Sequence, residues 1–200
     1  IASQIESMII DEFADLSQRP SPELLFDIMG FGKLPEDFNS DGRRLEEAGL
    51  SFKQSIQLLA DQWGLELDGF EGSADIALTT KSTPIAAGTL KGGTVGAQRM
   101  TWSGLVDGRP MISIRTNWYC CRDLVPKWEL ENTGWKIDLN SDAPLLIKFE
   151  FPESSEKLWL VTPGYTANRP VNAIPAVCEA EPGTKTLLDL PLITANLGHG

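Results

Sequence analysis

The alternation of apolar and polar residues divides the chain into a mixed N-terminal part and a β-rich middle part. The run IESMIIDEF is rich in β-branched and apolar residues and predicts a strand over residues 5–13. SPELLFDIMG predicts a short helix, in which Ser21 caps the start, Pro22 takes the first position and Gly30 ends it. The stretch that follows, residues 31–44, has the composition of a loop.

The clearest helical pattern lies in SFKQSIQLLADQWG. Its apolar residues recur at helical spacing and form one stripe: Phe52, Ile56, Leu59, Ala60 and Trp63. Ser51 and Gln54 make a capping box at the start, and Gly64 provides a left-handed end. We therefore expect a helix over residues 51–63.

From residue 72 onward the apolar period changes to two, which is typical of strands. ADIALTT predicts a short strand, and TVGAQRMTWSGLVDGRPMISIRTNWYCC predicts a hairpin that turns at Asp107-Gly108. Its second flank places Ile112, Ile114, Thr116 and Trp118 on one face, and Ser113, Arg115, Asn117 and Tyr119 on the other. Further strands are expected over residues 134–140, 145–151 and 157–161, with one helix near the end of the chain.

These elements predict an α+β domain: a mostly antiparallel sheet with helices on one face. Five of the six tryptophans lie in or beside the sheet region: Trp102, Trp118, Trp128, Trp135 and Trp159. The sheet face away from the helices is then either core or a subunit interface. We favour a homodimer formed through the sheet over a closed monomer.

Composition and charge narrow the class of protein. A chain of 200 residues with 42% hydrophobic and 22% charged residues fits a globular protein with a substantial core. Its formal net charge of -11 argues against nucleic acid and anionic membranes as partners, and an acidic surface most often serves solubility. No segment is long and apolar enough to span a bilayer, and we expect no signal peptide.

The three cysteines, Cys120, Cys121 and Cys178, form a poor disulfide framework, because their count is odd and two are adjacent. They fit a reducing compartment, so we expect a cytoplasmic location. The chain starts at Ile1 rather than Met, a few residues before an apolar run. We therefore expect it to be a piece of a longer protein.

Few residues carry chemistry of their own. The single histidine, His199, lies at the C-terminus, where a mobile tail is more common than a general base, so Ser-His-Asp and Cys-His mechanisms are disfavoured. Cys120 and Cys121 lack partners at zinc-ligand spacing. LKGGTVG, residues 90–96, lacks the lysine-serine pair of a phosphate loop, and no helix pattern follows it, so it predicts a turn or a bulge.

Four blocks carry a resemblance: PSPELLFDIMGFG, QSIQLLADQWGLELD, GTVGAQRMTWSGLVDGRPMISI and VNAIPAVCEAEPGTKTLLDLPLITA. In that order they resemble the C-terminal domain of the dihydrodipicolinate-reductase-like enzymes typified by 2,4-diaminopentanoate dehydrogenase, a group that includes the native amine dehydrogenases. The similarity covers nearly the whole chain. The last block is its most specific part.

The resemblance implies a two-domain, NAD(P)-dependent oxidoreductase that acts on a carbon bearing an amine or imine. In such enzymes an N-terminal Rossmann domain binds NAD or NADP, and the C-terminal domain shapes the substrate pocket and builds the dimer. Residues 1–200 would be that substrate-binding and oligomerisation domain. The Rossmann half and, by resemblance, the catalytic carboxylate lie outside this sequence, so we expect this chain alone to be inactive.

The last block raises a local question, because Pro175 lies in an apolar helical run three residues after Asn172. If a helix begins at Asn172, this residue caps it, and Pro175 sits in the first turn, where its missing N–H costs little. The resemblance also implies that this helix start faces the cleft. Arg169 and Asn172 would then contact the substrate or the nicotinamide amide, and the two interpretations are compatible.

Three further residues are candidates for substrate binding. Glu12, with Asp15 nearby, follows the first strand and could hold a substrate ammonium, although a solvated strand end is the simpler interpretation. Trp102 shares a hairpin face with Met100 and could form a pocket wall or plain sheet core. Tyr165 could donate a hydrogen bond.

Two other functions stay open beside the enzyme. The chain could be a stand-alone module that binds a small amphiphilic ligand, or a purely structural oligomerisation domain. Within the enzyme hypothesis the amine or ketone substrate is open, since fold-level analogy does not fix it. The choice of NAD or NADP is open too, because the deciding residue lies in the missing domain.

Overall fold

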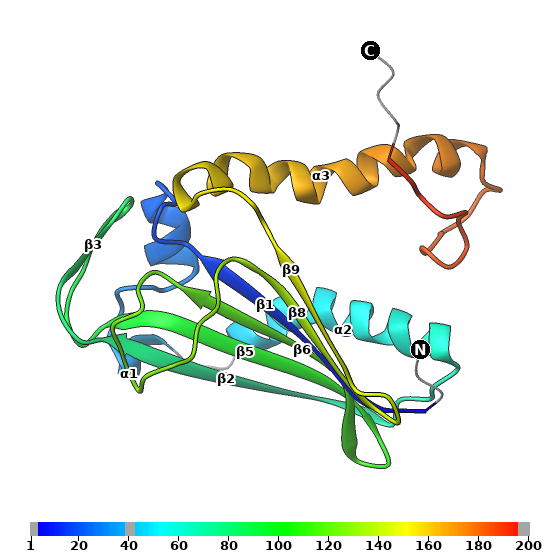
Figure 1. The fold of residues 1–200 in the computed structure, drawn as a ribbon, viewed down its shortest axis with the longest axis horizontal. Coiled ribbons are helices and arrows are strands. Elements are labelled where there is room, and N and C mark those ends of the chain that lie inside the picture. The colour runs from blue at the N-terminus through cyan, green and yellow to red at the C-terminus, as the bar shows by residue number, and fades with distance from the viewer. Residues whose placement is uncertain (1–3, 39–42, 196–200) are drawn as a thin grey trace. The chain divides into compact units, whose positions relative to one another are not determined.

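The computed structural model describes residues 4–38 and 43–195 (Figure 1). The chain divides into two compact units, residues 1–152 and 153–200. The first unit holds all strands of the described chain, and the second holds the last helix. Within the described chain, no helix is long and apolar enough to cross a membrane. The terminal His199 lies outside the described residues.

The first unit is a seven-stranded sheet with helices and a small hairpin. Its helical elements are the π-helix η1 (Glu23–Ile28), α1 (Pro35–Phe38) and α2 (Arg43–Trp63). Its strands are β1 (Ile5–Asp15), β2 (Gly69–Thr79), β3 (Thr83–Ile85), β4 (Gly88–Leu90), β5 (Val95–Val106), β6 (Arg109–Tyr119), β7 (Leu124–Val125), β8 (Gly134–Ser141) and β9 (Leu145–Glu150).

The strand order in the large sheet is β7-β2-β5-β6-β1-β8-β9, and β3 pairs with β4 apart from it. Every neighbouring pair of the large sheet is antiparallel except β1 and β6, which run parallel at its centre. The predicted α+β class with a mostly antiparallel sheet is therefore confirmed. The hairpin at Asp107-Gly108 is confirmed as well, with both residues at positive φ.

One face of the sheet is apolar and covered by helices. Ile56 and Ala60 of α2 are fully buried in a core cluster with Trp102 and Ile112 of the sheet. A second cluster joins Leu25 of η1 to the sheet, so η1 and α2 cover the same face. Figure 1 shows α2 extending along this face. The alternation predicted for β6 is confirmed, because its apolar flank faces these helices.

The helix α2 begins earlier than the sequence pattern indicated. It starts at Arg43 rather than Ser51, so the predicted capping box is wrong and Ser51 lies in the helix interior. The preceding residues, RRLEEAGL, contain good helix formers that extend the helix by two turns. Gly64 does end it with a positive φ of 66°. Part of the predicted loop is also helical, as the single turn α1.

Gly49 is the position in α2 where the chain needs the absence of a side chain. A Cβ there would lie 2.6 Å from Nε1 of Trp102. Trp102 is 1% exposed, stacks on Phe52 with ring centroids 4.4 Å apart, and donates a hydrogen bond to the carbonyl of Leu45 at 3.1 Å. The indole therefore fixes how closely α2 approaches the sheet.

The second unit contains α3 (Ser155–Glu179), which has three internal prolines: Pro163, Pro170 and Pro175. The strand predicted over residues 157–161 is wrong, since KLWLV forms the first turns of this helix. A five-residue apolar run fits either state, and the neighbouring helical residues decide it. Asn172 is no N-cap, because the helix already begins at Ser155; Pro175 lies in the interior and leaves the carbonyl of Val171 without its helical donor.

The close contact at Gly49 generates a stability prediction. We expect Gly49→Ala to lower the free energy of unfolding by about 1–2 kcal/mol, because the clash with Trp102 outweighs the better helix propensity of alanine. Urea denaturation measures the change. In a Trp102→Phe background the same substitution should cost less or stabilise; an equal loss in both backgrounds would contradict the clash.

Candidate functional site

A polar row interrupts the apolar, helix-covered face of the sheet. The strand register places Met100 of β5 opposite Thr116 of β6, and Thr116 opposite Glu12 of β1. Residues paired in this way share one face and lie about 5 Å apart. Trp118, two residues after Thr116, points to the same face. The first strand and the hairpin, which are distant in sequence, thus meet at Glu12.

Glu12 is a half-buried carboxylate with one hydrogen-bond donor. Nε1 of Trp118 donates to its Oε1 at 3.2 Å. Burial raises the pKa of Glu12 above its ordinary value, and the hydrogen bond from Trp118 only partly opposes this. Within the described part of the chain, no second side chain donates to this carboxylate. A cation that reached it would therefore find an unsatisfied acceptor.

Thr116 is fully buried, and its hydroxyl has no hydrogen-bond partner among the described residues. Such orphan side-chain groups are uncommon, because burying a hydroxyl without a partner costs free energy. In the sheet, Thr116 is paired with the cavity-lining Met100 on one side and with Glu12 on the other.

An apolar cavity of about 210 Å³ adjoins this row. It lies between η1, α2 and strands β2, β5 and β6, and is lined by Ile28, Met29, Phe38, Leu45, Glu47, Ala48, Ala74, Gln98, Met100 and Trp118. Gln98 is 3% exposed, and its Nε2 donates to the carbonyl of Met29 at 2.7 Å, which ties the end of η1 to the sheet. Trp118 is shared: its ring forms cavity wall and its N–H holds Glu12.

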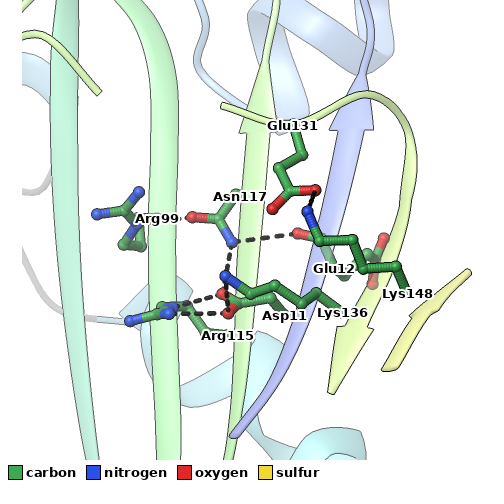
Figure 2. Close-up of polar contacts among 8 residues, drawn as sticks. All are labelled: Asp11, Glu12, Arg99, Arg115, Asn117, Glu131, Lys136 and Lys148. Carbon is green, nitrogen blue, oxygen red and sulfur yellow. Dashed lines mark hydrogen bonds and ion pairs between the residues drawn. The ribbon is translucent and has the colours of Figure 1, made fainter. Parts of the chain in front are cut away.

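On the opposite face of the sheet, Asp11 is the centre of a polar network (Figure 2). Its carboxylate is 2% exposed. It accepts two hydrogen bonds from Arg115, one of them from Nη2 at 2.8 Å, and one from Nδ2 of Asn117 at 3.0 Å. Nζ of Lys136 lies 3.6 Å from its Oδ2. The network therefore joins β1 to β6 on one side and to β8 on the other.

Asn117 carries this network to the backbone of Glu12 (Figure 2). Its Nδ2 also contacts the carbonyl oxygen of Glu12 at 3.3 Å, and its Oδ1 accepts from Nε of Arg99 at 2.6 Å. The Arg99 guanidinium in turn lies 4.5 Å from the centre of the Trp128 ring. The main chain at Glu12 is thus held from the face opposite to its side chain.

The pKa of Asp11 is lowered although the group is buried. Burial alone would raise this pKa, but the hydrogen bonds from Arg115 and Asn117 and the charges of Arg115 and Lys136 outweigh it. Asp11 and Glu12 are adjacent in sequence, yet their pKa values move in opposite directions. The cause is that alternation sends one to the charged network and the other to the apolar face.

The structure distributes the predicted site residues over both units. Glu12 lies at the row beside the cavity, whereas Trp102 packs in the core against Phe52. The cavity wall that the sequence assigned to Trp102 is formed by Met100 and Trp118. Asp15 shapes a turn, since its Oδ1 accepts from the backbone N–H of Ser17 at 3.0 Å.

The other three candidates lie on α3 in the second unit. Tyr165, Arg169 and Asn172 are spaced i, i+4 and i+7, so they share one face of that helix. Tyr165 and Arg169 are exposed, and Asn172 is partly exposed.

Sequence reasoning did not select Thr116 and Trp118 as site residues. The signal was present, because the alternation of β6 already placed a polar threonine on an otherwise apolar face. What the sequence lacked was the partner: nothing local indicates that β1 pairs in parallel with β6 and brings Glu12 alongside.

Comparison with known proteins matches residues 2–199 to the model of the 2,4-diaminopentanoate dehydrogenase C-terminal domain. The chain belongs to this family. It is 25% identical over 197 residues to a protein from Streptomyces virginiae named amine dehydrogenase. This match covers 96% of this chain and 54% of that protein.

The fold resembles a solved structure of amine dehydrogenase from Mycobacterium smegmatis, with a TM-score of 0.70 and 14% identity. This match covers 98% of this chain and 54% of that one. The 2,4-diaminopentanoate dehydrogenase-like domain therefore spans about half the length of both relatives.

The Asp11 network generates a prediction of stability against pH. We expect Asp11→Asn to lower the free energy of unfolding by about 2–3 kcal/mol at pH 7. Breaking a buried ion pair costs about 3–5 kcal/mol, and here the side chains of Arg115 and Lys136 remain 32% and 24% exposed. Because the folded pKa of Asp11 is depressed, this stabilisation is present above about pH 4 and is lost as the pH falls through the folded pKa.

The measurement is urea denaturation of both forms between pH 7 and pH 2.5. The difference in free energy of unfolding between the wild type and Asp11→Asn should shrink toward zero in acid. A difference that stays constant with pH would show that Asp11 acts through packing rather than charge.

Proposed function

We propose that this domain binds the amine substrate of an NAD(P)-dependent oxidoreductase, with Glu12 as the group that holds the substrate ammonium. The observation that carries the proposal is a half-buried carboxylate whose one protein donor, Trp118, also lines an apolar cavity. A ligand with a cationic amine at one end and an apolar body matches both features. The names of the two relatives support the same class of substrate.

The electrostatics favour the bound cation. Burial raises the pKa of Glu12 in the free domain, because it penalises the charged form. An ammonium at hydrogen-bond distance would stabilise the carboxylate and pair two charges in a site of low dielectric constant. Binding and ionisation of Glu12 would therefore support one another. An imine or a protonated amine would be held, and a neutral hydrocarbon of the same shape would not.

The cavity sets the size of the apolar part. An apolar cavity of about 150 Å³ is large enough for benzene. The 210 Å³ between η1, α2 and the sheet would therefore accept a single ring or a short branched chain. Met100 suits such a wall, because its flexible thioether adapts to ligands of different shape.

The nicotinamide cofactor, NAD or NADP, belongs in this proposal to a domain outside the chain. In the described part, residues 90–96 join β4 to β5 through a turn at Gly93, so they do not lead from a strand into a helix as a dinucleotide site requires. Residues 90–96 therefore do not match the strand-to-helix turn of a dinucleotide site. When bound elsewhere, the cofactor supplies the hydride acceptor, while this domain positions the amine.

We assign two roles to α3 in the complete enzyme. Leu160, Val171 and Ile174 share one side of the helix and are 60%, 57% and 56% exposed, which suits contact with the nucleotide domain. Arg169 and Asn172, with Tyr165, lie on a different side and would supply polar contacts to the substrate or to the nicotinamide amide.

We also propose that the protein is a cytoplasmic homodimer formed through the sheet. The edge strand β9 supports this, because Leu146, Ile147 and Phe149 on it are 54%, 37% and 51% exposed. Exposed apolar edge strands are templates for pairing with another chain. The three free thiols suit a reducing compartment.

Sedimentation of the native protein tests domain content and dimer together. This chain of 21.9 kDa covers 54% of its curated relative, so we expect a subunit of about 40 kDa and a dimer of about twice that mass. Phe149→Lys should yield the monomer. A native subunit of 21.9 kDa would contradict the two-domain proposal and leave a stand-alone binding or oligomerisation module.

Substitution of Glu12 tests the substrate site. In the native polypeptide that carries this domain, we expect Glu12→Gln to raise KM for a primary amine about tenfold or more, since a charge-assisted hydrogen bond is lost. Amine-dependent formation of NAD(P)H is the measurement.

Two comparisons make this test specific. The fold should persist or become more stable at neutral pH, because the raised pKa of Glu12 means that its ionisation opposes folding as the pH rises above about 4.3. Glu46→Gln, on the exposed side of α2, is the matched control and should leave KM unchanged. Equal KM values for Glu12→Gln and the wild type would remove Glu12 from the site.

A further inference from the structure

The unpartnered hydroxyl of Thr116 calls for an explanation that packing does not provide. The residue is 0% exposed, and its Oγ1 has no partner among the described residues. Valine has almost the same shape and would fill the position without a desolvated hydroxyl. A buried polar group without a protein partner is therefore a sign that something outside the protein pairs with it.

The neighbours of Thr116 indicate what that partner is. Glu12 lies directly across on β1, Met100 directly across on β5, and Trp118 two residues further along β6. Met100 and Trp118 line the cavity, and Trp118 also donates to Oε1 of Glu12. Thr116 and Glu12 do not line the cavity themselves, but Thr116 is paired with a carboxylate that has spare acceptor capacity and with one residue of the cavity wall.

We propose that Thr116 is a second acceptor for the substrate's ammonium group, acting together with Glu12. This inference rests on the proposed amine-binding function. A primary ammonium has three N–H donors. One would go to the Glu12 carboxylate and one to Oγ1 of Thr116, while the carbon attached to nitrogen leads into the cavity between Met100 and Trp118.

The arrangement assigns separate tasks to the three polar groups. The N–H of Trp118 occupies one side of Oε1 and orients the carboxylate, so the other acceptor positions of Glu12 remain for the ligand. Thr116 adds a directional acceptor without adding charge. Met100 lines the cavity and is paired with Thr116 across the strands, and its three rotatable bonds allow it to move aside when a ligand enters.

The proposal also defines which amines the site distinguishes. A primary ammonium can donate to both Glu12 and Thr116, whereas a quaternary ammonium carries the same charge but no N–H. Loss of the Thr116 hydroxyl should therefore weaken binding of the primary ammonium and leave the weak binding of its trimethylated analogue unchanged. Loss of the Glu12 charge should weaken both.

The test uses the native polypeptide and the nearly isosteric variant Thr116→Val. We expect KM for a primary amine to rise about ten- to a hundredfold, as for loss of a hydrogen bond to a charged group, with a smaller change in kcat. Calorimetry with cyclohexylammonium and its N,N,N-trimethyl analogue should show weaker binding of the first only. Thr101→Val, on the opposite face of β5, is the matched control and should change neither quantity.

The stability of the variant separates this role from a structural one. Thr116→Val should melt at the same temperature as the wild type or higher, since it removes a desolvated hydroxyl. Thr116→Ser keeps the hydroxyl, and it should keep KM within about threefold of the wild type. If the valine variant does not fold, Thr116→Ala against Thr116→Ser provides the same comparison.

Each outcome decides the question. An unchanged KM and unchanged ammonium affinity in Thr116→Val would show that the hydroxyl pairs with a buried water only, and would overturn the proposal while the amine-binding function stands. A wild-type protein that binds cyclohexylammonium but oxidises no amine would contradict the oxidoreductase function, and the calorimetric comparison would still decide the role of Thr116. A wild type that neither binds nor oxidises amines would overturn both.

Discussion

The ion pair between Asp11 and Arg115, with Asn117 and Lys136 around it, is the interaction on which the site depends. It joins the central strand β1 to β6 and β8 from the face opposite to η1 and α2. A shift of β1 by one residue would place Asp11 among the apolar side chains and turn Glu12 away from the cavity. Such a shift would be costly, because the buried Asp11 carboxylate meets its three polar partners in a single register. The charged network therefore fixes the position of Glu12, although it contacts only the main chain of that residue.

The two faces of the sheet use the same chemistry for opposite purposes. Asp11 is surrounded by cations and donors, so its charge is stable and its pKa is low. Glu12 has one donor and apolar surroundings, so burial raises its pKa. The first carboxylate is satisfied by the protein and is structural. The second still has acceptor positions for a ligand, and the unpartnered hydroxyl of the neighbouring Thr116 provides another. Adjacent residues obtain these different roles from the period of two in a β-strand.

Local patterns predicted much of the fold. The alternation of β6, the Asp107-Gly108 turn and the end of α2 at Gly64 all follow from spacing and turn chemistry. Glu12 was also selected from the sequence, although it was expected to follow the first strand and in fact lies within β1. The parallel pairing of β1 with β6 was not, because the two strands are about a hundred residues apart and no local signal specifies their register. The first turns of α3 were misassigned for a related reason: five apolar residues fit a strand or a helix until their neighbours are considered.

The most direct test of the central claim is a ¹³C NMR titration of the Glu12 carboxyl group in the native polypeptide, with Glu12→Gln identifying its signal. We expect a pKa above the ordinary value of about 4.3 in the free protein, because burial opposes the charge. The account predicts that a saturating primary ammonium lowers this pKa, since the bound cation stabilises the carboxylate. A pKa of Glu12 that the amine leaves unchanged would contradict the account.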